Sequence, residues 1–212
     1  MDTNLTGKHA LVCGSTQGIG NAVAMEFARL GARVTLLARN ADKLKAAVAL
    51  LDTRQGQEHG ILAVDMANTD ALQKALAQLM KNGPVDILVN NTGGPPPGLA
   101  HEADTATFAD AFRLHLLSSQ TLVRAVVPHM KEQKSGRIIN VISTSVKQPL
   151  PNLGVSNTIR GAVANWAKTL ATELGPYGIT VNNVLPGATG TERLAAIVKN
   201  KATKSGTSED AA

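Results

Sequence analysis

Cysteine and long apolar segments are both scarce in this sequence. Its one cysteine, Cys13, excludes an internal disulfide framework and is typical of a protein kept in a reducing compartment. No apolar run approaches the length of about 18 residues that a membrane-spanning helix needs. The first residues, MDTNLTGKHALV, lack the order of basic and then apolar residues that marks a secretory signal. We therefore expect a soluble, cytoplasmic protein with no membrane partner.

Aromatic residues are also few: the 212 residues include three phenylalanines, one tyrosine and one tryptophan. The formal net charge is +5, but the lysines and arginines are scattered, apart from Lys199, Lys201 and Lys204 near the end of the chain. Proteins that bind nucleic acids combine a basic patch with rings on which bases stack. The sequence therefore argues against a nucleic-acid partner, and the positive charge suits an anionic cofactor better. We expect no metal site.

Six short apolar segments alternate with longer segments of helical period. The apolar segments are rich in Val, Ile and Leu with little polar alternation, as expected of strands covered on both faces. They span residues 9–14, 32–38, 60–65, 86–91, 137–143 and 178–185, and the helical segments span about 19–30, 41–52, 69–81, 104–132 and 153–174. This order predicts an α/β fold, a doubly wound, Rossmann-like parallel sheet flanked by helices. We expect a single domain over residues 1–194 and a polar, mobile tail over 195–212.

A glycine-rich turn, CGSTQGIG, follows the first predicted strand and opens the first predicted helix. Gly14 allows a tight turn out of the strand, while Gly18 and Gly20 allow backbone N–H groups to approach a pyrophosphate closely. The spacing is G-x-x-x-G-x-G, which differs from the G-x-G-x-x-G of other dinucleotide folds. A glycine-rich connector of purely structural use is the alternative, but the strand–turn–helix context favours dinucleotide binding.

The residues after the second and third strands concern the adenosine end of such a cofactor. An acidic residue after the second strand would bind the ribose hydroxyls, but Ala38 and then Arg39 stand there. An arginine gives a planar, permanently charged fork that suits a ribose 2′-phosphate, which favours NADP(H) over NAD(H). Asp65, at the end of the third strand, is placed to accept from the adenine amino group.

Further motifs occur in a characteristic order: NNTG at 90–93, RAVVPHMKEQKSGRIINVIS at 124–143 and LPG at 185–187. With the glycine turn, they make the chain resemble the short-chain dehydrogenase/reductase family from about residue 7 to residue 191. The resemblance implies an NAD(P)(H)-dependent oxidoreductase. It also implies the residues that line the cofactor cleft: Gly14, Ser15, Gln17, Gly18, Ile19, Gly20, Arg39, Asp65, Met66, Asn91, Gly93, Pro186 and Gly187. Thr92 stands where the family usually has alanine.

This chain has different residues at most of the family's catalytic positions. The resemblance implies a serine after the fifth strand, then a tyrosine, then a lysine four residues later, with an asparagine in the preceding long helix. The serine is present as Ser143, but the other positions hold Ser156, Arg160 and His115. The single tyrosine, Tyr177, precedes the sixth strand, where a packing or turn role is expected. The resemblance therefore makes this chain an atypical member.

A serine hydroxyl is far less acidic than a phenol, and an arginine is a poor acid, so the proton for carbonyl reduction needs another source. We expect Ser143 to orient a small-molecule substrate, Arg160 to supply positive charge, and water or His115 to supply the proton. A buried, hydrogen-bonded His115 of structural use is the alternative reading. The other function that stays open is a cofactor-binding protein without turnover, serving as a redox sensor or a partner subunit.

Two further features concern the surroundings of this site. The proline-rich segment GGPPPG at 93–98 is stiff, and either shapes a substrate pocket or caps the fourth strand. By analogy with the family, we expect a homo-oligomer, and we expect the C-terminal part of the family fold, including a seventh strand, to be missing from this chain.

Overall fold

The computed structural model describes residues 3–191, 194–195, 198–199, 202 and 206–208. Six strands form one sheet in the order β3-β2-β1-β4-β5-β6, and every neighbouring pair is parallel. The strands are β1 (His9–Cys13), β2 (Arg33–Ala38), β3 (Gly60–Ala63), β4 (Ile87–Asn90), β5 (Gly136–Val141) and β6 (Ile179–Val184). The order reverses beside β1, so the predicted doubly wound, Rossmann-like sheet is confirmed.

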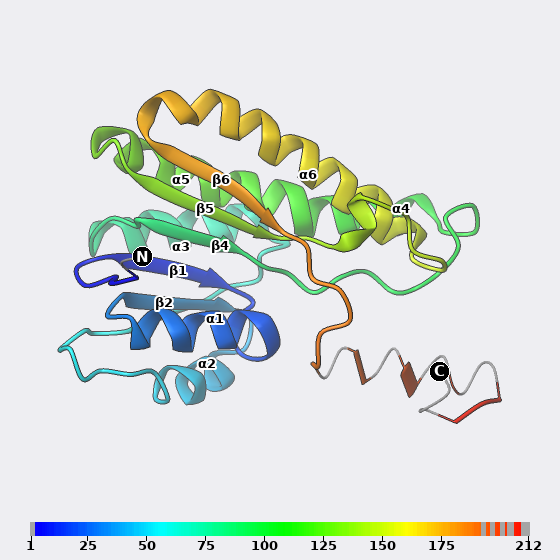
Figure 1. The fold of residues 1–212 in the computed structure, drawn as a ribbon, viewed down its shortest axis with the longest axis horizontal. Helices are drawn as coiled ribbons and strands as arrows, with labels where there is room; N and C mark the ends of the chain where they lie inside the picture. Colours follow the sequence, from blue (N-terminus) through cyan, green and yellow to red (C-terminus); the bar gives the residue numbers. More distant parts are fainter. Residues whose placement is uncertain (1–2, 192–193, 196–197, 200–201, 203–205, 209–212) are drawn as a thin grey trace.

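Helices cover both faces of this sheet (Figure 1). They are α1 (Gly18–Arg29), α2 (Ala41–Val48), α3 (Thr69–Lys81), α4 (Thr105–Phe112), α5 (Ser118–Glu132) and α6 (Gly154–Leu174). Helices α1 and α2 pack on β1, β2 and β3, whereas α5 and α6 pack on β4, β5 and β6. A separate apolar core lies on each face of the sheet. Leu36 and Val89 belong to the core on the α1 side, and Leu88 and Ile138 to the core beneath α5 and α6.

The single long helix predicted over residues 104–132 is wrong in one respect. A π-helical turn, Arg113–Leu117, separates α4 from α5. Such a turn inserts a residue into the helical repeat and is frequent at functional sites. Nothing in the apolar periodicity of the sequence marks it. The consequence is that His115 lies inside this turn, at 3% exposure.

Three asparagines form a row across the centre of the sheet. Asn90, Asn140 and Asn183 are aligned in register on β4, β5 and β6. Asn90 Nδ2 donates to Asn140 Oδ1 at 2.8 Å, and Asn140 Nδ2 donates to Asn183 Oδ1 at 3.1 Å. Asn90 and Asn140 are 5% and 1% exposed, so these bonds form away from water and fix which residues face one another.

The structure does not test the expected mobile tail or the basic cluster near the end of the chain. The tail over 195–212 falls largely on residues outside the described part of the chain, as do Lys201 and Lys204.

Among the described residues, no helix is long and apolar enough to cross a membrane. Within the same part of the chain, no group of three or more His, Cys, Asp or Glu side chains is placed to hold a metal ion.

Candidate functional site

The glycine turn lies between β1 and α1 in a conformation that requires glycine. Gly14 and Gly18 both have φ of +58°, in the left-handed region. A Cβ on Gly14 would lie 2.7 Å from the carbonyl oxygen of Asn91, and a Cβ on Gly20 would collide with the carbonyl oxygen of Gly14. Asn91 Nδ2 donates to the carbonyl oxygens of Cys13 and Gly14, at 3.2 and 3.3 Å. The end of β4 is thereby tied to the turn.

Some residues of this turn are buried and others are exposed. Ser15 is fully buried, and its hydroxyl donates to the Leu37 carbonyl at 3.4 Å, so its side chain stabilises the turn against β2. Gln17 and Gly18 are exposed, and Ile19 is partly buried. Gln17 has an extended backbone and precedes α1 directly. The first N–H groups of α1 therefore begin at the exposed part of the turn, where an anion is stabilised by the helix dipole.

Arg39 and Asp65 are exposed at the same edge of the sheet. Arg39 directly follows β2, and Asp65 lies two residues after β3. Asp65 Oδ1 accepts from the Ala67 N–H at 3.0 Å, which holds the loop after β3 in a turn. The Met66 side chain is only 6% exposed and belongs to the core, so a cofactor would meet its backbone rather than its side chain.

Arg160 lies on α6, one turn after Ser156, and is only 8% exposed. Its Nη1 donates to the Val141 carbonyl at 2.9 Å, and its Nη2 donates to the Thr92 carbonyl at 3.4 Å. The guanidinium therefore joins the carboxyl ends of β5 and β4. Two nitrogens of the side chain that was expected to supply positive charge therefore donate to backbone carbonyls.

His115 and Thr92 form a second contact beside the first. His115 Nδ1 is hydrogen-bonded to the Thr92 hydroxyl, and the His115 carbonyl accepts from Ser119 Oγ at 2.7 Å. Thr92 thus contacts Arg160 through its carbonyl and His115 through its side chain. The sequence marked Thr92 as a departure from alanine but gave it no role. The available signal was a hydroxyl in place of the family's methyl group, 23 residues before a histidine that also departs from the family pattern.

Ser143 and Ser156 lie on the segments that adjoin this cluster. Ser143 follows β5 and is partly buried, and its Oγ accepts from the Ser145 N–H at 3.1 Å. Ser156 is in the first turn of α6 and is also partly buried. The Thr144 N–H donates to the Pro186 carbonyl at 3.4 Å, which brings the Pro186–Gly187 segment beside Ser143. Gly93 and Gly187 are both exposed.

Cys13 takes no part in this chemistry. It is fully buried at the end of β1, and burial raises the pKa of its thiol to about 12. A thiol with such a pKa stays protonated and unreactive near neutral pH.

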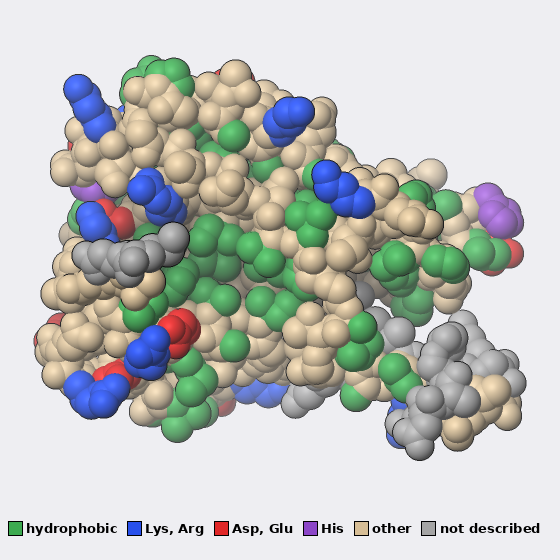
Figure 2. Space-filling view, in the orientation of Figure 1, with side chains coloured by type: hydrophobic (Ala, Val, Ile, Leu, Met, Phe, Trp, Pro, Cys, Tyr) green, Lys and Arg blue, Asp and Glu red, His purple; other side chains and the backbone are tan. Residues whose placement is uncertain are grey.

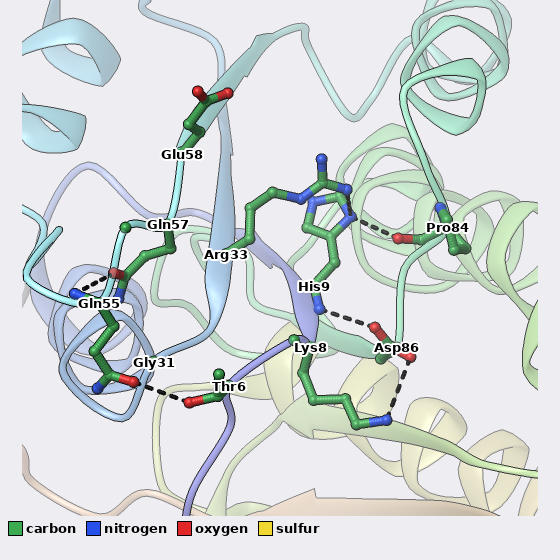
Figure 3. A pocket seen from close by; sticks show the side chains of 12 residues that line it. Thr6, Lys8, His9, Gly31, Arg33, Gln55, Gln57, Glu58, Pro84 and Asp86 are labelled. Atoms are coloured by element: carbon green, nitrogen blue, oxygen red, sulfur yellow. Dashed lines mark hydrogen bonds and ion pairs between the residues drawn. The ribbon is translucent and has the colours of Figure 1, made fainter.

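Hollows in the described part of the molecule include the following two. One, of about 440 Å³, runs along α1 from Gly18 to Phe27 and is closed on its other side by Thr189, Gly190 and Thr191. Its walls are mainly apolar. In Figure 2, apolar side chains also gather in the middle of the face, over the strands beside α1. The other, of about 330 Å³, lies at the amino ends of β1 and β2, opposite the glycine turn (Figure 3).

The second hollow is lined by polar and charged groups that lie close to one another. The His9 N–H donates to Asp86 Oδ2 at 2.8 Å, and His9 Nε2 is hydrogen-bonded to the Thr35 hydroxyl at 2.8 Å. His9 Nδ1 lies 2.6 Å from the Pro84 carbonyl oxygen and 2.8 Å from Arg33 Nη2 (Figure 3). Burial and the Arg33 charge lower the pKa of His9, against the opposing effect of the Pro84 carbonyl and Asp86. This cluster therefore stabilises the folded chain most when His9 is neutral.

Comparison with known proteins identifies the fold's relatives. Residues 8–202 match the model of the short chain dehydrogenase family. The chain belongs to this family. Gluconate 5-dehydrogenase of Gluconobacter oxydans is 30% identical over 199 residues, which cover 93% of this chain and 77% of the relative. Glucose 1-dehydrogenase of the same organism is 36% identical over 187 residues, covering 86% of this chain and 69% of the relative.

Solved structures of short-chain dehydrogenases agree. The L-sorbose reductase of Gluconobacter frateurii, complexed with NADPH and L-sorbose, has a TM-score of 0.91 and 32% identity, covering 100% of this chain and 81% of that one. A putative NAD(P)-dependent gluconate 5-dehydrogenase from Beutenbergia cavernae with bound NADP has a TM-score of 0.88 and 27% identity, covering 95% and 80%. These neighbours support NAD(P) use by short-chain dehydrogenases of this shape.

The residues of this short-chain dehydrogenase fit such a cofactor at the glycine turn. The space that a Cβ would fill at Gly14 and Gly20 is already taken by neighbouring backbone and by Asn91, so any larger residue would push the turn outward. Gln17 and Gly18 are exposed at the helix N-terminus, with the Thr191 side chain beside Gly18. A pyrophosphate needs this combination of close backbone and helix dipole.

Proposed function

We propose that this chain is an NADP(H)-dependent oxidoreductase that transfers a hydride between the nicotinamide and a small-molecule carbonyl or alcohol, with a non-standard catalytic site. The observation that carries the proposal is the glycine turn, in which Asn91 Nδ2 donates to the Cys13 and Gly14 carbonyls and Gln17 and Gly18 are exposed at the start of α1. The bound NADPH and NADP of the structural neighbours support it.

The cofactor-binding residues divide by the part of the cofactor that they would meet. Gly14, Ser15, Gln17, Gly18, Ile19 and Gly20 would hold the pyrophosphate, and Asp65 and Met66 the adenine. Arg39 is exposed directly after β2, where its fork would bind a ribose 2′-phosphate and so favour NADP(H). Asn91, Gly93, Pro186 and Gly187 would lie along the nicotinamide half. When bound, the cofactor supplies or accepts the hydride.

Without the family's tyrosine, the proton for carbonyl reduction must come from another source in this chain. Reduction of a carbonyl adds a hydride to carbon and a proton to oxygen, and Ser156 is too weak an acid to give that proton. Ser143 would orient the carbonyl, and Arg160 would contribute positive charge while holding β4 and β5 together. The proton would come from water or from His115, whose ring is held by Thr92.

A cofactor-binding protein without turnover is the second candidate, and one observation favours it. Two of the Arg160 nitrogens donate to backbone carbonyls, so this residue serves packing at a position where the family places a catalytic lysine. A chain that keeps the glycine turn but uses Arg160 for packing would suit a redox sensor or a partner subunit.

The chain is titrated with NADPH and NADH and then assayed for activity with a panel of ketones and alcohols. These measurements distinguish an oxidoreductase from a cofactor-binding protein without turnover. Tight NADPH binding with turnover supports the enzyme, whereas tight binding with no turnover on any substrate supports the second candidate. Absence of binding would overturn both. Arg39→Ala is expected to weaken NADPH far more than NADH, and Arg54→Ala, an exposed arginine far from the glycine turn in sequence, is the charge-matched control. Equal loss for both cofactors would refute the 2′-phosphate assignment.

We also propose that the chain is a cytoplasmic homo-oligomer. Phe112 and Leu117 are 39% and 40% exposed at the junction of α4 and α5, where their apolar side chains are available for a contact between copies. Sedimentation of the purified chain tests this, and a monomer at all concentrations would contradict it.

A further inference from the structure

Two loops meet beyond the carboxyl ends of β4 and β5 and form a continuous edge, which we call the apolar rim (residues 93–100 and 148–154). The Gly98 N–H donates to the Asn152 carbonyl at 2.8 Å, and the Gly154 N–H donates to the Gly98 carbonyl at 2.9 Å. Gly98 and Leu153 form a parallel bridge. A Cβ on Gly154 would collide with the backbone of Ala100, so the two loops are in direct contact.

The apolar rim is unusually poor in polar groups for an exposed surface. Leu99 is 44% exposed and Leu150 is 39% exposed. The exposed prolines on the same edge are Pro96, Pro97, Pro149 and Pro151. The two loops contain no charged side chain, and their only side chains with hydrogen-bonding groups are Gln148 and Asn152. In Figure 2, apolar side chains lie at the end of the molecule that carries α4 and these loops, and a histidine and an acidic side chain lie at the tip of the same end.

The rim is joined to the candidate catalytic residues at three points. Its first loop begins directly after Thr92, which contacts His115 and Arg160. Its second loop follows the short turn Thr144–Val146 that Ser143 precedes. That loop ends at the start of α6, which carries Ser156 and Arg160. Figure 1 shows both loops side by side at this end of the sheet. The segments that carry Ser143, Ser156 and Arg160 are therefore continuous with the rim.

The rim is also stiff. Pro95, Pro96 and Pro97 fix three consecutive φ angles. On the other loop, Asn157 Nδ2 donates to the Leu150 carbonyl at 2.8 Å, and Asn157 Oδ1 accepts from the Leu150 N–H at 3.4 Å. Backbone polar groups of the rim are thereby engaged within the protein, and the surface left for a ligand is mainly side-chain carbon.

We propose that the substrate of this chain carries an apolar chain or ring next to its carbonyl or alcohol, and that this group lies on the apolar rim. The inference rests on the proposed function. A sugar would bring several hydroxyls against Leu99, Leu150 and the prolines, where few groups replace the water that the hydroxyls lose. An alkyl or aryl group gains free energy from the same contact. The chain would thus differ from the relatives whose names refer to gluconate, glucose or sorbose.

The test is a chain-length series. Calorimetry measures the affinity of 2-butanol, 2-hexanol and 2-octanol for the chain saturated with NADP⁺, with L-sorbitol as the polyhydroxylated comparison. Each added methylene that contacts the rim is expected to tighten binding about fourfold, the factor that corresponds to about 0.8 kcal/mol per buried CH₂. L-Sorbitol is expected to bind no more tightly than 2-butanol. Equal affinity across the alcohols, or tighter binding of L-sorbitol, would overturn the inference.

Variants of the rim locate the effect. Leu99→Asn and Leu150→Asn are expected to reduce the gain per methylene to about twofold or less, since they replace part of the carbon surface. Leu50→Asn is the matched control, because Leu50 is 71% exposed and lies just beyond α2. If the rim variants change the oligomeric mass and leave the alcohol series unchanged, the surface is a contact between copies and the inference is wrong.

Cofactor binding separates this inference from the proposed function. Normal NADPH binding with a flat alcohol series would overturn the apolar substrate alone. Absence of NADPH binding by the unaltered chain would overturn the proposed function and, with it, this inference. Normal NADPH binding with the stepped series, lost only in the rim variants, supports both.

Discussion

Replacing Arg160 by methionine tests whether this residue holds the ends of β4 and β5 together. Methionine keeps much of the length and apolar stem but cannot donate, so the Val141 and Thr92 carbonyls lose a charged partner. A hydrogen bond to a charged group contributes about 1.5–3 kcal/mol, and the 3.4 Å bond to Thr92 is the weaker of the two. We expect the free energy of unfolding to fall by about 2–4 kcal/mol. Arg160→Lys should lose less, because the ammonium still reaches one carbonyl.

The assay is urea unfolding followed by circular dichroism, with thermal unfolding as a second measurement. A loss of that size lowers the midpoint temperature by roughly 5–12 °C for a chain of this length. Lys168→Met is the control, since it removes a positive charge from an exposed position on the same helix. If Arg160→Met stays within about 0.5 kcal/mol of the unaltered chain, as Lys168→Met is expected to, the buried hydrogen bonds contribute no stability and the reasoning fails.

Three further predictions follow from the same structure. Gly20→Ala should abolish NADPH binding, because its methyl group would collide with the Gly14 carbonyl; fluorescence titration checks this, and retained affinity would contradict the close packing of the turn. The His9 pKa is lowered by burial, so the unfolded chain binds more protons and stability should fall as the pH drops below 6.5; in His9→Gln, urea midpoints measured from pH 7 to pH 5 should fall less steeply, and an unchanged slope would exclude His9. Thr92→Val should alter the ¹⁵N shifts of the His115 ring, whereas Thr92→Ser should restore them; identical spectra for all three would show that the hydroxyl does not hold the ring.

The sheet and the glycine turn could be predicted because their signals are local. The strands are continuous Val, Ile and Leu runs, and Gly14 and Gly18 stand where the chain needs a positive φ. The order of the motifs then indicated the family, which the comparisons confirm. These features depend on neighbours in the sequence, so composition and spacing suffice to find them.

The arrangement around Arg160 could not be predicted, because it depends on segments far apart in the chain. Arg160 donates to the Val141 carbonyl of β5 and to the carbonyl of Thr92, two residues after β4, and the Thr92 side chain contacts His115 of the π-helical turn. Residue type gave candidates for the site but not the partners that they contact. The asparagine row of β4, β5 and β6 was also missed, although an asparagine near the end of each of three apolar strands is a signal that could have been used.

The π-helical turn between α4 and α5 has a consequence for how the two helices face. Each residue of an α-helix rotates the chain by about 100°, so one inserted residue resets the phase of everything that follows. Phe108 and Ala111 of α4 can therefore face α6 while Leu122 and Val126 of α5 face the sheet. Deleting one residue from Arg113–Leu117 would join the helices into a single rod and turn one of these two faces to water. Because of the π-helical turn, one continuous segment contributes side chains to two apolar cores, and His115 lies where the phase of the helical repeat changes.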